Sequence, residues 1–361
     1  MALPIALDYR PALLSAAGIG RATRELARAL AANDDVELHL FAHSLARARC
    51  ITELPVAARL HRLPIPGRSL PWLARVGLPA DRLAGGVRVF HWTDYVQPPV
   101  AKAATVLTVH DLAFVRDPTW HGADAVSLRE RTRAAISKAR AVIVPSQATA
   151  NDLRTFAPGA TVHIVPFGAD HTPVSTQSLH PLGDRPYALC LGTIEPRKNH
   201  RPLLEAWRRL REPRPLLVVV GRIGWECEEV VLALRGAVTD GLVDWRTDVE
   251  DAGVWSLIQH AELLVYPSLW EGFGFPPLEA MQLGVPVVAN DIVPLRELGD
   301  GALAFADATN PAALAETIER VLRDEALRIR LRAAGRVCAA RFRWRGCAAA
   351  HVAIYREVAA W

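Results

Sequence analysis

The sequence has no long apolar run, no cysteine pair at metal-binding spacing and no two aspartates separated by one residue. No apolar run among the 361 residues approaches 18, and the first residues lead directly into a strand-like segment, so we expect neither a membrane span nor a signal peptide. The five cysteines are odd in number and lack C-x-x-C spacing, which argues against a disulfide framework or a zinc site and fits a reducing cytoplasm. None of the 19 aspartates stands two positions from another, so no Asp-x-Asp metal pair exists. We therefore expect no metal site and no cofactor.

Composition indicates a globular protein of two domains. Hydrophobic residues make up 51% of the chain and charged residues 22%, and 361 residues suit two domains of about 150 to 180 residues each. Residues 1–180 carry 20 Lys and Arg against 14 Asp and Glu, a net +6, whereas residues 181–361 carry 22 against 24, a net −2. The basic first half suits an anionic membrane surface or, equally, a solvated basic face, and we expect no nucleic-acid partner.

Apolar strands and amphipathic helices alternate along the whole chain. Strands are expected at 3–8, 36–41, 87–91, 105–109, 187–191, 216–220, 242–247 and 285–290, and helices at 22–32, 126–140, 147–156 and 201–211. This alternation predicts parallel, doubly wound sheets. The expected organisation is a first Rossmann-like domain at 1–170, a polar linker at 171–186, a second Rossmann-like domain at 187–340 and a terminal helical segment at 341–361.

One stretch, residues 266–286 (YPSLWEGFGFPPLEAMQLGVP), combines a strand end, a glycine-rich loop and a helix start. Glu271 lies in the loop and Glu279 near the start of the helix, so two carboxylates flank backbone N–H groups that suit an anion. A ligand that carries both phosphate and hydroxyl groups, such as a nucleotide-sugar, satisfies both features. The alternative is a pair of unrelated surface glutamates, against which the aromatic residues between glycines and prolines argue.

This stretch resembles the donor-site signature of the family-4 glycosyltransferases, retaining enzymes of GT-B fold. GTIEPRKN (192–199), TVHDLAFVRDP (108–118) and DYRPALLSAAGIGRATREL (8–26) resemble further segments of that family, as do VHIVPFGAD (162–170) and the terminal ARFRWRGCAAAHVAIYREV. Phe167 stands where the family usually has Asn. The resemblance implies two Rossmann-like domains facing a cleft, with the last helix crossing back onto the first domain.

The resemblance also assigns roles to single residues. Catalytic roles fall to His110, Arg197, Lys198 and Glu271, with Arg197 and Lys198 as a clamp for the diphosphate. The residues implied in donor binding are Gly18, Gly20, Gly192, Arg197, Lys198, Glu271, Gly272, Phe273, Gly274 and Glu279. Whether Glu271 could act as a nucleophile stays open. The acceptor-side candidates, from position alone, are His91, Tyr95, Asp111 and Arg116, while the loop at 242–247 with Trp245 is the expected place of the nucleotide base.

The predicted function is transfer of a hexose from a nucleotide-sugar to a hydroxyl of a growing glycan or lipid-linked saccharide. The motifs most resemble the mannosyltransferase-like branch, so GDP-mannose is the first choice of donor and UDP-hexoses follow. The alternatives are a nucleotide-sugar epimerase of the same architecture and a non-enzymatic nucleotide-sugar-binding protein; a Rossmann-type NAD protein lacks its third glycine, because Thr23 occupies that position. A cytoplasmic location, with peripheral contact to the inner face of the membrane, completes the expectation.

Overall fold

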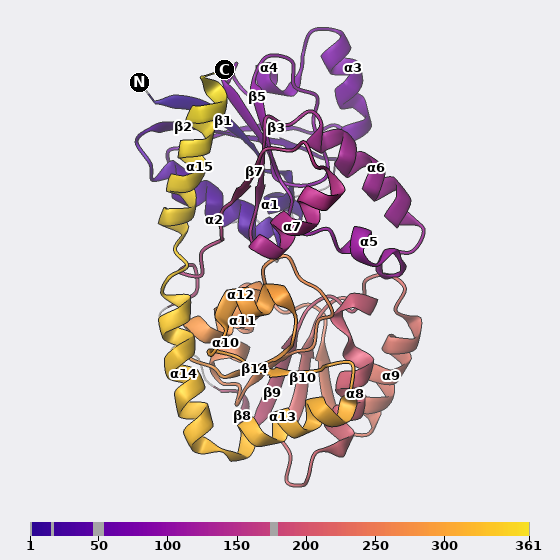
Figure 1. Cartoon of the computed structure of the whole chain (residues 1–361). Coiled ribbons are helices and arrows are strands. Elements are labelled where there is room, and N and C mark those ends of the chain that lie inside the picture. Colours follow the sequence, from indigo (N-terminus) through magenta and orange to yellow (C-terminus); the bar gives the residue numbers. More distant parts are fainter. Residues whose placement is uncertain (1, 16–17, 46–53, 174–179, 361) are drawn as a thin grey trace. The chain divides into compact units, whose positions relative to one another are not determined.

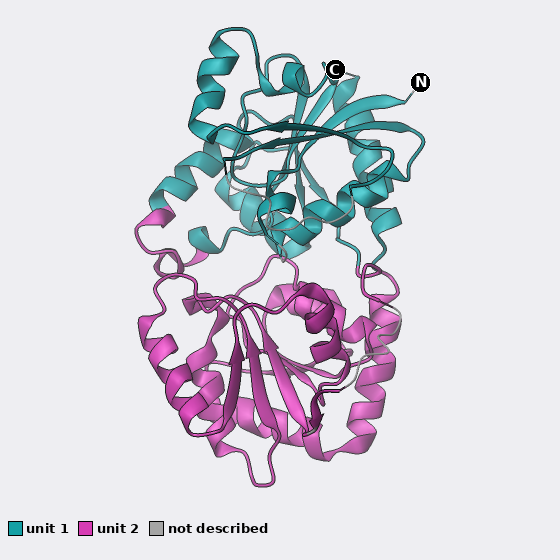
Figure 2. Ribbon diagram, turned by 180° about the vertical axis from the view of Figure 1, so that it is seen from behind, with its two compact units in different colours: residues 1–115, 126–168, 342–361 teal, residues 116–125, 169–341 magenta. Residues whose placement is uncertain are grey.

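The chain divides into two compact units. The computed structural model describes residues 2–15, 18–45, 54–173 and 180–360 (Figure 1). Unit 1 comprises residues 1–115, 126–168 and 342–361, and unit 2 comprises residues 116–125 and 169–341 (Figure 2). Parts of three sequence predictions, namely Ala16 and Ala17 of the first loop, Cys50, and residues 174–179 of the linker, lie outside the described residues.

The described residues of unit 1 form a seven-stranded parallel sheet in the order β3-β2-β1-β4-β5-β6-β7. Its strands are β1 (Leu3–Asp8), β2 (Val36–His43), β3 (Arg59–Leu63), β4 (Val89–Trp92), β5 (Ala104–Thr108), β6 (Ala141–Val144) and β7 (Val162–Ile164). The helical elements are α1 (Arg10–Leu14), α2 (Ile19–Ala31), η1 (Gly67–Ser69), α3 (Leu70–Arg75), α4 (Ala80–Leu83), α5 (Ala113–Arg116), α6 (Asp124–Ile136), α7 (Gln147–Phe156) and the terminal α15 (Trp344–Ala359). Apolar residues are buried on both faces of the sheet, with Ala6 and Phe90 on one face and Ile5 and Leu7 on the other.

The described residues of unit 2 form a six-stranded parallel sheet in the order β11-β10-β9-β12-β13-β14. Its strands are β9 (Tyr187–Leu191), β10 (Leu216–Val220), β11 (Val243–Arg246), β12 (Leu264–Tyr266), β13 (Val287–Asn290) and β14 (Ala304–Ala306). The helical elements are η2 (Pro118–Trp120), η3 (Pro196–Lys198), α8 (His200–Arg209), α9 (Glu228–Thr239), α10 (Asp251–Gln259), α11 (Phe275–Gln282), α12 (Val293–Gly299), α13 (Pro311–Arg323) and α14 (Glu325–Ala339).

Each sheet reverses its strand order once, and that point determines where ligands bind. In unit 1 the first strand β1 lies between β2 and β4, and in unit 2 the first sheet strand β9 lies between β10 and β12. Open parallel sheets bind ligands outside the carboxyl ends of their strands at such a switch point. We therefore expect ligand-binding residues in the loops after β1 and β4 and in those after β9 and β12.

The terminal helix α15 packs on unit 1 through buried polar contacts. The hydroxyl of Tyr355 lies 2.6 Å from Nδ1 of His91, and Arg88 donates from Nη2 to the carbonyl of Ala359 at 2.7 Å. Arg140 donates to the carbonyl of Val358 at 3.2 Å. The predicted return of the last helix to the first domain is thus observed within unit 1.

The predicted parallel, doubly wound architecture is confirmed, with three local differences. The predicted first domain ran without interruption to residue 170, whereas residues 116–125 pack with unit 2. The predicted linker at 171–186 contains a short strand, β8 (Pro181–Asp184). The strand β3 and the helices α3 and α4 were not predicted, because β3 (RLHRL) mixes apolar residues with basic ones on a partly exposed strand and prolines at 64, 66, 71 and 79 interrupt the helical pattern.

Candidate functional site

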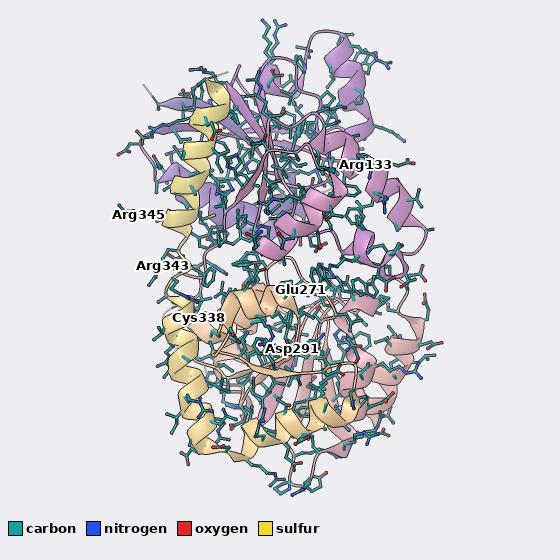
Figure 3. All side chains as sticks on the ribbon, viewed as in Figure 1. Arg133, Glu271, Asp291, Cys338, Arg343 and Arg345 are labelled. Carbon is teal, nitrogen blue, oxygen red and sulfur yellow. The ribbon has the colours of Figure 1, made fainter. Side chains whose placement is uncertain are left out.

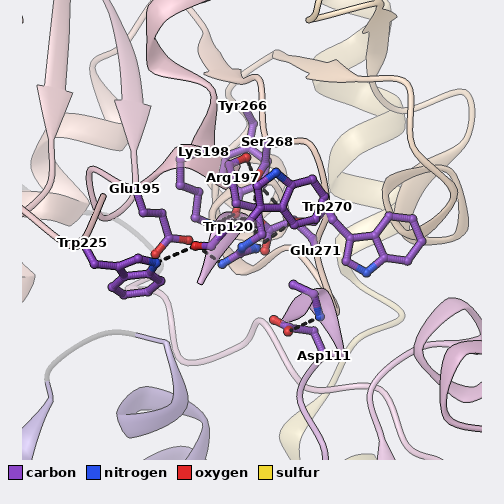
Figure 4. A network of polar contacts seen from close by, with 11 residues as sticks. Asp111, Trp120, Glu195, Arg197, Lys198, Trp225, Tyr266, Ser268, Trp270 and Glu271 are labelled. Atoms are coloured by element: carbon purple, nitrogen blue, oxygen red, sulfur yellow. Dashed lines mark hydrogen bonds and ion pairs between the residues drawn. The ribbon is translucent and has the colours of Figure 1, made fainter. Parts of the chain in front are cut away.

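Glu271, Arg197 and Lys198 meet at the carboxyl ends of β9 and β12 in unit 2 (Figure 4). Lys198 Nζ donates to Glu271 Oε1 at 2.5 Å and to the hydroxyl of Tyr266 at 3.0 Å. Arg197 Nη1 lies 3.1 Å from the same carboxylate oxygen, and Ser268 Oγ donates to it at 2.5 Å. Two predicted cations and one predicted carboxylate, separated by more than 70 positions in the sequence, thus form one cluster.

Glu271 is ionised although it is only 7% exposed. Burial alone would raise the pKa of its carboxyl group, but Lys198 and Arg197, followed by hydrogen bonds from Lys198 and Ser268, outweigh burial and lower the pKa to about 2. The Tyr266 hydroxyl has a pKa raised well above its usual range, first by burial and then by the Glu271 charge, so it stays protonated. Arg197 Nη2 also donates to Glu195 Oε1 at 2.8 Å, so the cluster contains two cations, two carboxylates and a neutral phenol.

Hydrogen bonds to backbone carbonyls hold the loop after β9 and the loop after β12 together. Asn199 has a left-handed backbone (φ 57°) and donates from Nδ2 to the carbonyls of Pro267 and Ala308 at 3.2 and 2.8 Å. The N–H of Leu269 donates to the carbonyl of Arg197 at 2.8 Å. Glu271 and Asp291 follow the adjacent strands β12 and β13 (Figure 3). The Glu271 loop is thus fixed to the loop that carries Arg197 and Lys198.

Gly274 shapes the start of α11. It has φ +100°, and a Cβ at this position would lie 2.8 Å from Cδ2 of Leu295, so both backbone and space favour glycine. Pro276 and Pro277 occupy the first turn and carry no N–H. The anion site expected here therefore depends on the backbone between Gly272 and Phe275, and it stays a prediction.

Glu279 is 1% exposed and pairs with a histidine that sequence reasoning missed. Nε2 of His171 lies 3.1 Å from Glu279 Oε1, and the His171 ring contacts the rings of Trp255 and Phe275 at centroid distances of 5.6 and 6.1 Å. His171 falls in the predicted linker, and no local pattern marks it. Only the fold brings it to α11.

In unit 1, His110 is held in one tautomer at the end of β5. Its Nε2 lies 2.8 Å from the carbonyl oxygen of Thr93, which can only accept, so Nε2 carries the proton. Burial lowers the pKa of His110, although its bond to Thr93 and the nearby Asp111 and Asp94 oppose this shift. The Phe167 ring stacks on it at 5.6 Å. His110 is therefore neutral near pH 7, with Nδ1 as an acceptor.

The acceptor-side candidates fall into different environments. His91 is fully buried, and its two ring nitrogens contact Tyr355 and Thr108, so its role is structural. The Tyr95 hydroxyl donates to the carbonyl of Asp111 at 2.7 Å, close to His110 in the sequence. Tyr95 and Asp111 remain candidates for contact with the acceptor.

Residues 116–125, and with them Arg116, belong to unit 2, whereas the other acceptor candidates belong to unit 1. The Arg116 guanidinium lies 3.5 Å from the centroid of the Trp270 ring, next to Glu271 in the sequence. Trp225 Nε1 donates to the carbonyl of Trp120 at 2.6 Å. Arg116 was proposed from its position in the sequence alone. That position does not predict that residues 116–125 pack with unit 2.

Of the predicted glycines outside the Glu271 loop, Gly18 precedes helix α2, Gly20 lies in its first turn and Gly192 follows strand β9. Gly18 has φ +57° and precedes α2, and Gly20, one residue into that helix, would place a Cβ 2.1 Å from the carbonyl oxygen of Ser15. A Cβ on Gly192 would lie 3.4 Å from Cδ of Lys198, so this glycine lines the lysine stem. Trp245 Nε1 donates to the carbonyl of Gly221 at 3.0 Å. The roles of these residues in donor binding stay predictions.

Three features of the described residues bear on chemistry. The cysteines among them, Cys190, Cys227, Cys338 and Cys347, are free and buried. No group of three or more His, Cys, Asp or Glu side chains in the part of the chain that the structure describes is arranged to hold a metal ion. No helix found there is both long enough and apolar enough to cross a membrane.

Family models match both halves of the chain. The model described as Glycosyltransferase Family 4 matches residues 16–172, and the model described as Glycosyl transferases group 1 matches residues 174–337. Together they cover nearly the whole chain and meet at the boundary between its two halves.

Individual relatives agree with these matches. O-antigen chain mannosyltransferase B of Escherichia coli is 29% identical over 372 residues, which cover 94% of this chain and 96% of that protein. Alpha-maltose-1-phosphate synthase of Mycobacterium tuberculosis is 31% identical over 292 residues, covering 71% and 73%. Sucrose-phosphate synthase from Thermosynechococcus elongatus superposes with a TM-score of 0.80 at 22% identity over 99% of both chains, which shows the fold. The chain therefore belongs to glycosyltransferase family 4, as a mannosyltransferase-like enzyme with the GT-B fold.

Proposed function

We propose that this glycosyltransferase moves mannose from GDP-mannose to an acceptor hydroxyl on a growing glycan or lipid-linked saccharide, with retention of anomeric configuration. The observation that carries the proposal is the cluster of Glu271, Lys198 and Arg197 at the switch point of unit 2. The likeness to an O-antigen chain mannosyltransferase supports mannose as the sugar. UDP-hexoses are the second choice of donor.

Lys198 and Arg197 would stabilise the leaving diphosphate. Both cations contact Glu271, and Arg197 also pairs with Glu195 at 2.8 Å. A bound diphosphate would compete for them, because it offers more negative charge than one carboxylate, and Glu271 would then accept hydrogen bonds from sugar hydroxyls. Cations fixed where charge develops on the leaving group lower the barrier, and more so in a site shielded from water.

Glu279 and His110 would complete the donor contacts. A carboxylate held by His171 is suited to accept hydrogen bonds from the two ribose hydroxyls. His110 offers a neutral Nδ1 acceptor to a hydroxyl of the transferred sugar, since its other nitrogen is bound to the carbonyl of Thr93. In this proposal Glu279 binds the ribose and His110 binds the transferred sugar.

We place the enzyme in the cytoplasm, in peripheral contact with the inner face of the membrane. Supporting this, the basic first half of the chain carries Trp72 on α3 with 61% of its surface exposed and Val76 with 54%. An exposed tryptophan beside basic residues suits an anionic lipid surface. Flotation with anionic vesicles at low salt checks this: binding that Trp72→Ser abolishes supports it, and no binding by the wild type removes the membrane claim.

The experiment that tests the donor site compares two glutamate variants with a surface control. Glu271→Ala should lower kcat/KM for GDP-mannose by about 100-fold or more while GDP still binds, because the lost contacts are to the sugar. Glu279→Ala should weaken GDP itself. The control is Glu229→Ala, which removes a carboxylate with 85% of its side chain exposed.

Titration calorimetry with GDP and initial rates with GDP-mannose separate these effects. Wild-type rates and affinities in both glutamate variants would contradict the donor-site assignment. Release of nucleoside diphosphate only when an acceptor is present distinguishes transfer from epimerisation.

A further inference from the structure

A second polar cluster, which the donor-site proposal does not use, lies at the carboxyl ends of three adjacent strands in unit 1. Asp8 ends β1, His43 ends β2, and Asp94 follows β4, while Arg10 lies at the start of α1. Arg10 Nη2 forms an ion pair with Asp94, and its backbone N–H donates to Asp8 Oδ1 at 3.1 Å. The cluster is built at the switch point of the sheet, where ligands bind.

Three buried atoms of this cluster have no hydrogen-bond partner among the described residues: Asp8 Oδ2, Arg10 Nε and His43 Nδ1. Asp8 is 0% exposed and His43 is 3% exposed. A buried polar atom without a partner costs about 1 to 3 kcal/mol, so three together are unusual in a site that serves only the fold. Such a set suggests that a ligand supplies the missing partners.

The cluster is close to electrically neutral. Burial, and then the Asp94 charge, raises the pKa of Asp8 to about 8, and Arg10 only partly opposes this shift, so Asp8 is mostly protonated at pH 7. Burial, and then the Arg10 charge, lowers the pKa of His43 to about 4, so its ring is neutral. The Arg10 charge is balanced by Asp94. The site thus offers neutral donors and acceptors.

We propose that Asp8, Arg10 and His43 bind the hydroxyl groups of an uncharged sugar at the end of the acceptor glycan. The inference rests on the proposed function and narrows it, because it excludes a sugar phosphate as the direct occupant. A phosphate carries up to two negative charges, whereas these three residues supply a single cation, Arg10, which is already paired with Asp94. Hydroxyl groups both donate and accept, which matches a neutral carboxyl, a neutral imidazole and a guanidinium N–H.

The position of the cluster relative to His110 agrees with this assignment. The hydroxyl of Thr93 donates to the carbonyl of Asp8 at 2.7 Å, and the carbonyl of Thr93 accepts from His110 Nε2 at 2.8 Å. Asp8 and His110 are therefore linked through a single residue within unit 1. An acceptor sugar held by Asp8 lies beside the histidine assigned to the transferred sugar.

The first test measures binding without any donor, so that its failure is distinct from failure of the donor assignment. The probes are methyl α-mannoside, methyl α-glucoside and α-mannose 1-phosphate, followed by saturation-transfer NMR. We expect an uncharged glycoside to bind wild type, Asp8→Ala to lose at least about 90% of the effect, and mannose 1-phosphate to bind more weakly. Preferential binding of the phosphate, or equal binding by Asp8→Ala, would overturn the proposal.

The second test separates a neutral carboxyl from a carboxylate by kinetics. Asp8→Asn keeps the shape, a donor and an acceptor, so the KM for an uncharged oligosaccharide acceptor should stay within about threefold of wild type, whereas in Asp8→Ala it should rise about 10-fold or more. The KM for the donor should change less than twofold in both. The charge-matched control is Asp34→Asn on the surface. An equal rise of the acceptor KM in Asp8→Asn and Asp8→Ala would show that an ionised Asp8 is needed, and it would overturn the role of a neutral carboxyl.

The pH dependence of the acceptor KM adds a readout that a merely structural role would not change. As pH rises from 7 to 9, Asp8 loses its proton and its donor, so the acceptor KM of wild type should rise, while that of Asp8→Asn stays flat. Asp94 and Arg10 are the charges that set this transition. The other titratable or charged side chains on the neighbouring elements are Glu37, His39 and His43 on β2, His91 on β4, and Arg21, Arg24, Glu25 and Arg28 on α2. The same rise in Asp8→Asn would assign the titration to another group and overturn the role of Asp8.

Discussion

Glu271 keeps its negative charge in a buried position because two cations lie within about one hydrogen-bond length of it. Lys198 Nζ is 2.5 Å and Arg197 Nη1 is 3.1 Å from the same oxygen. Two unit charges 4 Å apart at an effective dielectric constant near 20 interact with roughly 4 kcal/mol, which exceeds the modest worth of an exposed pair. The same charges that stabilise Glu271 are available to a diphosphate when a donor binds.

The first residue-scale prediction concerns the clamp. Lys198→Ala and Arg197→Ala should each lower kcat by about 100-fold or more, because each removes a charge that stabilises the leaving diphosphate. Lys198→Arg should restore little, since a planar guanidinium does not replace a point charge that also donates to Tyr266. Steady-state rates measure this. Near-complete rescue by Lys198→Arg would contradict the point-charge role.

The second prediction concerns acid stability. The pKa of Glu271 is depressed from 4.5 to about 2, so the unfolded state takes up the proton first as pH falls. The stabilisation is therefore complete above pH ~4.5 and is lost as pH falls towards 2; at 1.36 kcal/mol per pKa unit it amounts to at most roughly 3 kcal/mol. Melting temperatures of wild type and Glu271→Gln should differ most above about pH 5 and converge near pH 2. A gap that stays constant across this range would contradict the ion pairs.

At this scale the sequence predicts the charged residues but not their buried partners. Glu271, Arg197 and Lys198 stand in motifs whose residue types suggest a phosphate and hydroxyl ligand, and the structure brings them together. His171 has no local signature, since its pairing with Glu279 crosses 108 positions. The burial of Asp8 Oδ2 without a partner is likewise not predictable from local sequence, because it depends on where the strands β1, β2 and β4 end.

Among the elements, α11 owes its start to one glycine. Gly274→Ala should destabilise the protein by about 1 to 3 kcal/mol and weaken GDP binding, because alanine is strained at φ +100° and its Cβ would meet Leu295. The matched control is Gly236→Ala in α9, where a Cβ meets nothing within 4 Å, and there we expect about 0.5 to 1 kcal/mol of stabilisation. Urea unfolding and GDP titration measure both. A neutral Gly274→Ala would contradict the helix-start geometry.

Buried strands were predicted well, and so was the edge strand β11, but the edge strand β3 was not. The expected strands 187–191 and 216–220 match β9 and β10, and helix 147–156 with its Ser146 cap matches α7, whose cap accepts from Thr149 N at 3.1 Å. Continuous apolar runs reveal such strands because both faces are covered. The edge strand β3 (RLHRL) is largely polar and half-exposed, so its pattern resembles a loop. The passage of residues 116–125 into unit 2 depends on tertiary contacts alone.

For the whole molecule, the terminal helix closes unit 1 through a buried hydrogen bond. Tyr355→Phe should lower the free energy of unfolding by about 1 to 3 kcal/mol, because it leaves Nδ1 of the buried His91 without its partner. Arg356→Ala on the same helix breaks an exposed pair with Asp35 and should change stability by less than about 0.5 kcal/mol. Equal effects in the two variants, measured by urea unfolding, would contradict a specific role for the Tyr355 hydroxyl.

The predicted independence from metal follows from how the charge of a diphosphate is balanced. The chain has no Asp-x-Asp pair, and Arg197 and Lys198 lie at the predicted site with their side chains only 13% exposed. Two fixed cations can compensate a diphosphate in place of a divalent ion. We therefore expect turnover to persist in EDTA, and an activity that collapses in EDTA and returns with magnesium would show that the clamp is misassigned.

The most direct test of the central claim is proton NMR of the enzyme with GDP-mannose, an uncharged mannooligosaccharide acceptor and EDTA. The account predicts GDP and a new α-anomeric signal in equal amounts, with GDP release that depends on the acceptor and is lost in Glu271→Ala. GDP released equally without acceptor, a β-anomeric product, or full turnover by Glu271→Ala would contradict it.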